Sequence, residues 1–133
     1  MAGDLHLGFF VLAVALMFAH ELDAMQRHEW RIIPGLSRLP DRIGMQMFVL
    51  AHIPLFAGVF WYGALSIAAD GDRFSLGFSL FCVVHALVHW AFERHPRCEF
   101  KNPLSRSLIW TCALAGLVSL VAFCAATGQG GGA

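Results

Sequence analysis

Hydrophobic residues along the chain fall into four long runs, at about residues 5–25, 43–68, 74–92 and 104–126. Within each run the apolar positions are continuous, whereas a half-buried strand would alternate apolar and polar residues. A helix needs about 20 apolar residues to cross the ~30 Å hydrocarbon core of a bilayer, and the third run, slightly shorter than the others, is still within the usual range. The pattern therefore predicts an all-α fold, a four-helix transmembrane bundle.

The segments between the runs carry residues typical of helix ends. Asn102 and Pro103 match an N-cap and a first helical residue, and residues 69–72 have the composition of a tight turn. Gly128 follows the last run, and a glycine-rich stretch comes after it. We therefore expect one transmembrane domain, residues 1–127, and a flexible tail, residues 128–133.

The composition agrees with a membrane protein. Of the 133 residues, 58% are hydrophobic and only 14% are charged, whereas a soluble domain is about one quarter charged. The first run does not resemble a secretory leader, because it lacks a basic start and a small-x-small cleavage site. The four cysteines form no CxxC pair, which argues against a disulfide framework and a structural zinc knuckle.

The basic residues predict the orientation of the chain. Only Arg73 lies on one side of the predicted bundle, and the other eight lie on the opposite side: Arg27, Arg31, Arg38, Arg42, Arg94, Arg97, Lys101 and Arg106. The positive-inside rule makes this second side cytoplasmic, so both termini are expected on the non-cytoplasmic side. We expect a multi-pass protein of the bacterial inner (cytoplasmic) membrane. The charges are too few, and too close to the membrane, to indicate binding to nucleic acid.

Histidines are the most unusual feature of the apolar runs. His20 closes the first run, His52 lies within the second, and His85 and His89 lie one helical turn apart in the third. Because successive helices run in opposite directions, all four are expected in the cytoplasmic half of the bilayer. A titratable ring inside a membrane needs a partner or a function, so these residues mark the candidate site.

Metal binding is the favoured interpretation of this cluster. Imidazole and carboxylate groups are the usual ligands of zinc and non-haem iron, and bundles take such ligands from facing helices. We expect a divalent metal, zinc or iron, on His52, His85, His89 and a fourth ligand, His20. Glu21 or Asp23 would be a ligand or a general base for metal-bound water, and the substrate would be lipid-like.

Other interpretations stay open. The histidines of a non-enzymatic membrane protein can form a structural or pH-sensing polar network, and a bundle can also hold a bis-histidine haem. If the first helix continues without a break, Glu29 points away from the face of His20. His6 lies on the other side of the membrane and is expected to be unrelated.

The lipid bilayer is one expected partner, and a homo-oligomer is possible because much of the bundle surface is free.

Three short motifs carry a resemblance to a known family: HELDA (20–24) followed by EWR (29–31), HIPLF (52–56), and HxxxH (85–89). With these motifs the chain resembles a family of small uncharacterised bacterial integral-membrane proteins, over most of its length up to about Ser105. The resemblance implies a compact bundle of four transmembrane helices and no assigned activity. A looser likeness exists to the HXXEE-type membrane proteins. The chain is also similar to membrane di-iron hydroxylases in its HxxxH motif, but it has no HxxHH motif.

Overall fold

The computed structural model describes residues 2–68 and 73–129, and this part of the chain is all-helical, as predicted. Four helices are long and apolar enough to cross a membrane. Two short 3-10 helices, η1 (Glu29–Arg31) and η2 (Leu36–Arg38), follow the first of them. The four long helices are α1 (Ala2–Gln26), α2 (Asp41–Ala68), α3 (Arg73–Phe92) and α4 (Pro103–Gln129).

The helices agree with the four hydrophobic runs, and their ends differ from the expected ends by a few residues. The last helix continues to Gln129, so Gly128 lies within it and not beyond its end. The expected turn at residues 69–72 and the part of the expected tail at 130–133 lie outside the described residues.

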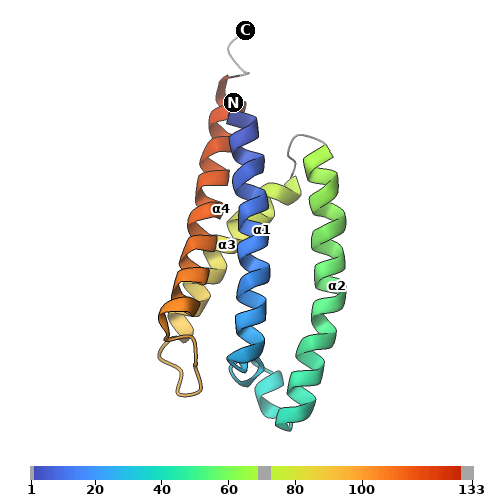
Figure 1. The fold of residues 1–133 in the computed structure, drawn as a ribbon, viewed down its shortest axis with the longest axis vertical. Coiled ribbons are helices and arrows are strands. Elements are labelled where there is room, and N and C mark those ends of the chain that lie inside the picture. Colours follow the sequence, from blue (N-terminus) through green and yellow to red (C-terminus); the bar gives the residue numbers. More distant parts are fainter. Residues whose placement is uncertain (1, 69–72, 130–133) are drawn as a thin grey trace.

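Packing among the four helices is uneven (Figure 1). α1, α3 and α4 lie together, with the most extensive contact between α1 and α4, whereas α2 stands to one side of them. Only 11% of the most hydrophobic window of α2 is buried, compared with 39% of that of α4. The fold is therefore a three-helix core with a fourth helix that is joined to it mainly through η1, η2 and α3.

Small residues allow α3 and α4 to approach closely. A Cβ atom added to Gly116 would lie 2.5 Å from the carbonyl oxygen of Ser79 and 3.1 Å from Cβ of Cys82. Membrane helices pack in this way because lipid provides no hydrophobic force that would drive them together.

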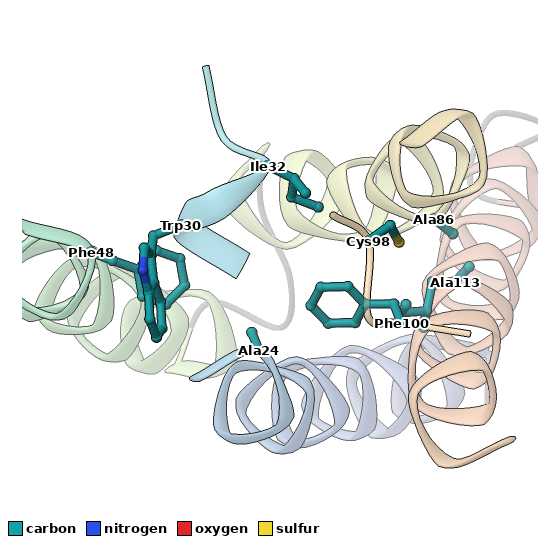
Figure 2. Close-up of a cluster of buried hydrophobic side chains, with 9 residues drawn as sticks. Ala24, Trp30, Ile32, Phe48, Ala86, Cys98, Phe100 and Ala113 are labelled. Carbon is teal, nitrogen blue, oxygen red and sulfur yellow. The ribbon is translucent and has the colours of Figure 1, made fainter. Parts of the chain in front are cut away.

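The segments that join the helices at one end of the bundle fold inward and close it. We call this end, which carries residues 27–40 and 93–102, the basic end. Its buried cluster contains Trp30 and Ile32 from the first segment and Cys98 and Phe100 from the second (Figure 2). The functional side chains described below lie directly beside this cluster.

Candidate metal centre

Four potential metal ligands meet at the basic end of the three-helix core. They are His20, Glu29, His85 and His89, and one ligand atom from each lies within 4.8 Å of all the others. They come from α1, η1 and α3, so the group exists only in the folded chain. Three of its members, His20, His85 and His89, are among the residues that the sequence predicts as metal ligands.

Two of the ligands come from one face of α3. Residues four positions apart lie one above the other on a helix, and the Nε2 atoms of His85 and His89 are 3.2 Å apart. The ring of His20 on α1 faces both, with its centroid 4.9 Å from that of His85 and 4.8 Å from that of His89. Phe100 packs against the rings of His20 and His89 and covers them with an apolar surface.

Glu29 joins the group because the chain turns after α1. The helix ends at Gln26, and His28 adopts a left-handed backbone conformation with φ of 53°, which is uncommon for a residue other than glycine. The following turn, η1, places Oε1 of Glu29 3.4 Å from Nε2 of His89. The expectation that Glu29 points away from His20 is therefore wrong, because it assumed an uninterrupted helix.

The ring of His20 is buried without a polar partner. Its exposed fraction is 1%, and neither of its ring nitrogens has a hydrogen-bond partner within residues 2–68 and 73–129. Nδ1 of His89 is unpaired in the same way. Since an unsatisfied buried polar group costs about 1–3 kcal/mol, these nitrogens are the strongest indication that the group holds a ligand.

The distances suit a first-row metal ion. Tetrahedral ligands at about 2.0–2.1 Å from zinc lie ~3.3 Å from one another, and the separations of 3.2 Å and 3.4 Å around Nε2 of His89 agree with this value. The other separations are at most 4.8 Å, so they would have to shorten by up to about 1.5 Å. Three imidazoles and one carboxylate suit zinc and non-haem iron equally.

The charge state of Glu29 also suits metal binding. Burial raises the pKa of its carboxyl group, but the hydrogen bond with His89 and the nearby His20 and His85 outweigh this effect and hold the pKa below its ordinary value. The ionised carboxylate, which is the form that binds metals, is therefore favoured.

His52 and Glu21, two further predicted site residues, lie outside this group and contact each other. Nε2 of His52 on α2 is 2.9 Å from Oε2 of Glu21 on α1. Nδ1 of the same ring lies 2.6 Å from the carbonyl oxygen of Phe48. The pair spans the space between α1 and the outlying helix α2.

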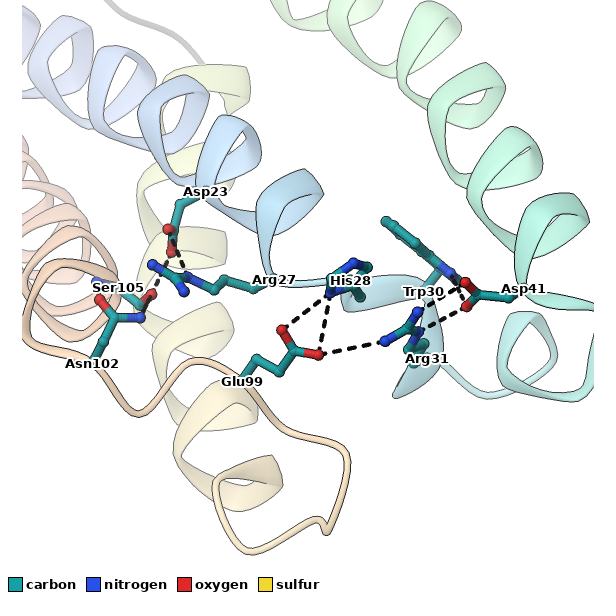
Figure 3. A network of polar contacts seen from close by, with 9 residues as sticks. All are labelled: Asp23, Arg27, His28, Trp30, Arg31, Asp41, Glu99, Asn102 and Ser105. Carbon is teal, nitrogen blue, oxygen red and sulfur yellow. Dashed lines mark hydrogen bonds and ion pairs between the residues drawn. The ribbon is translucent and has the colours of Figure 1, made fainter.

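Asp23 also lies apart from the group, in contacts that join α1 to α4 (Figure 3). Its carboxylate accepts a hydrogen bond from the buried hydroxyl of Ser105, and one of its oxygens is 3.2 Å from Nε of Arg27. Asn102 supports this contact, because its side chain bonds Ser105 at the start of α4. These contacts give Asp23 a clear structural role.

A comparison with protein-family models matches residues 7–126 to DUF6713, a family of unknown function. The chain belongs to this family. The prediction of an uncharacterised family is thereby confirmed, while the assignment of the individual motifs to it and the looser likeness to the HXXEE-type proteins stay predictions. Neither the comparison with curated proteins nor the comparison with solved structures finds a match.

A network at the surface of the basic end holds the turn that carries Glu29 (Figure 3). Arg31 donates to both carboxylate oxygens of Asp41, at 2.7 Å and 2.8 Å, and the indole of Trp30 donates to the same carboxylate at 3.0 Å. On the other side, Nδ1 of His28 is 3.1 Å from Glu99. The residues before and after Glu29 are thus fixed to α2 and to the 93–102 segment.

Another buried histidine, His6, lies near the opposite end of the bundle. Nδ1 of His6 is 3.0 Å from the carbonyl oxygen of Ser119, and Nε2 is 3.0 Å from the hydroxyl of Ser75. Unlike His20, this ring has partners at both nitrogens. His6 lies far along α1 from His20, as the sequence predicts, and its contacts link α1, α3 and α4.

Proposed function

We propose that this protein is a bacterial inner-membrane protein that binds one divalent metal ion, zinc or iron, through His20, Glu29, His85 and His89. One observation carries the proposal: the fully buried ring of His20 faces His85 and His89, and among the described residues neither of its nitrogens has a hydrogen-bond partner. A metal ion would bind the lone pair of one of these nitrogens, and this would offset part of the free energy that burial of the unpaired ring costs.

The two alternative functions explain this observation less well. A purely structural network accounts for the contacts of His89 with His85 and Glu29, but it leaves His20 unpaired at the centre of the group. A bis-histidine haem would have to insert a macrocycle between its two axial rings. The three ring centroids are only 4.5–4.9 Å from one another, which leaves no such space.

We further propose that the metal serves a reaction on a lipid-like substrate. A small cavity of about 120 Å³ borders Glu29 and His89, and its other walls are apolar side chains that include Ile33, Val88 and Phe92. A hydrocarbon group suits such a surface. Of the two carboxylates predicted as a general base, Glu21 suits the role better, because it borders a cavity, whereas Asp23 is held by Ser105 and Arg27.

Elemental analysis of the purified full-length protein tests the metal proposal. We expect about one zinc or iron ion per chain after purification or reconstitution, and almost none in His20→Ala or Glu29→Gln. His52→Ala is the matched control, and it should retain the metal because His52 lies outside the group. If the unaltered protein retains clearly less than one ion after reconstitution, the proposal fails.

A further inference from the structure

A larger groove lies between α1 and the outlying helix α2. Its volume is about 460 Å³, and apart from Glu21 and His52 it is lined by apolar side chains, among them Leu22, Val49 and Ile53. Phe18 of α1 and Phe56 of α2 also line the groove, and their ring centroids are 4.6 Å apart. The volume is within the range of about 300–1,000 Å³ that is typical of ligand sites.

The two polar groups in this groove, Glu21 and His52, are joined by a hydrogen bond. The carbonyl oxygen of Phe48 can only accept a hydrogen bond, so Nδ1 of His52 must donate to it. Nε2 then either donates to the carboxylate of Glu21 or accepts from its protonated form. In both arrangements the pair has zero net charge, because any charge on His52 is balanced by the opposite charge on Glu21.

A neutral pair of this kind selects the polar end of a ligand. A phosphate or an ammonium group would bring an uncompensated charge into an apolar groove, which is costly. Both protons of the pair are already donated, one to Phe48 and one between His52 and Glu21, so the pair offers a ligand an acceptor, the second carboxyl oxygen of Glu21, to which an uncharged hydroxyl can donate. The apolar walls suit a hydrocarbon chain attached to that hydroxyl.

The groove lies next to the proposed metal centre. Glu21 follows His20 directly in α1, and neighbouring residues of a helix point about 100° apart. His20 therefore faces the three-helix core while Glu21 faces the groove. A hydroxyl held at Glu21 would be positioned beside the metal ligands.

We infer that this groove binds a single-chain amphiphile with an uncharged hydroxyl end, a long-chain alcohol, whose hydroxyl contacts the Glu21–His52 pair. The inference rests on the proposed function and names the substrate class of the metal site. Ordinary membrane lipid and a second copy of the chain are the competing occupants, and the experiment distinguishes them.

The test uses a photoreactive C16 alcohol and the corresponding photoreactive alkane, each added to the full-length protein in lipid nanodiscs. We expect the alcohol to label groove residues at least fivefold more strongly than the alkane, and unlabelled hexadecanol to compete. The double variant Glu21→Leu/His52→Leu, which leaves neither partner unpaired, should lose this excess. Val49→Trp, which fills the groove and keeps the pair, should lose it as well.

Val121→Trp is the matched control, because Val121 lies exposed on α4 and outside the groove; its labelling should equal that of the unaltered protein. Equal labelling by alcohol and alkane would overturn the inference in favour of ordinary lipid, and cross-links between two chains would overturn it in favour of a dimer. Metal content is measured on the same samples. In the unaltered protein, absence of selective labelling with the metal retained defeats only this inference, whereas selective labelling without metal defeats the proposed metal function.

Discussion

The Nε2 atoms of His85 and His89 lie 3.2 Å apart on successive turns of α3. Without a metal ion, this distance requires a proton on one of the two nitrogens, which then donates to the other. With an ion, both nitrogens are unprotonated and both lone pairs point to the same centre. The same geometry therefore describes a hydrogen bond in one state and half of a coordination shell in the other.

His85→Ala should weaken metal binding strongly, because it removes one of four ligands and the hydrogen-bond partner of His89. We expect the apparent affinity for zinc to fall by more than about tenfold, since loss of even an outer-shell partner costs 10–100-fold in known sites. Competition with a chromogenic chelator measures the change. His95→Ala, which alters a histidine outside the group, is the control and should bind zinc like the unaltered protein.

Removal of the metal should lower the thermal stability of the protein. An ion that binds only the folded state at one hundred times its dissociation constant stabilises that state by about 2.7 kcal/mol. Thermal unfolding in one detergent, before and after chelation, should therefore show a drop of several degrees in Tm that added metal reverses. Glu29→Gln should show a much smaller response to added metal. An equal response in this variant would contradict the assignment of Glu29 as a ligand.

Sequence patterns predicted what depends on local periodicity. The four apolar runs predicted the four long helices, and the i, i+4 spacing predicted that His85 and His89 lie on one face of α3. Because successive helices run in opposite directions, the sequence also predicted that His20 lies at the same depth in the bundle as His85 and His89. These properties need only the rise and the angle per residue of a helix.

The remaining parts of the site depend on tertiary arrangement. His52 was expected to be a ligand because its depth matched, but depth does not determine the lateral position of a helix, and α2 stands beside the core. Glu29 was missed because the left-handed residue His28 turns the chain, and no sequence pattern identified that turn. The one indication in the sequence was that Glu29, a carboxylate, follows the first apolar run by only a few residues.

Gly116→Ala should destabilise the contact between α3 and α4. The added methyl group would lie 2.5 Å from a backbone oxygen of Ser79, so the helices must move apart. Overpacking of this kind costs about 1–3 kcal/mol, which thermal unfolding in detergent will detect. Gly77→Ala on α3 is the control, because among the described residues nothing outside its chain neighbours and its own helix backbone lies within 4 Å of its added Cβ; it should be neutral or stabilise the helix by up to about 1 kcal/mol.

Reporter fusions should place the basic end in the cytoplasm. The start of α1 and the end of α4 lie at the same end of the molecule, opposite the segments 27–40 and 93–102 (Figure 1). Because eight basic residues lie near these two segments, we expect alkaline phosphatase to be active when fused after Ala133 and inactive when inserted after Arg97. Activity at the second position alone would reverse the predicted orientation.

His6→Ala and His20→Ala should affect stability in different ways, although both rings lie on α1 and both are 1% exposed. His6 has partners at both nitrogens, so its removal leaves Ser75 and Ser119 with fewer bonds and should cost about 1–3 kcal/mol whether or not metal is present. Removal of the His20 ring breaks no side-chain hydrogen bond in the part of the chain that the structure describes. We therefore expect His20→Ala to cost less in metal-free protein and to abolish the stabilisation by zinc, as measured by thermal unfolding with and without zinc. If both variants lose the same stability and respond to zinc alike, His20 is a structural residue and the metal assignment is wrong.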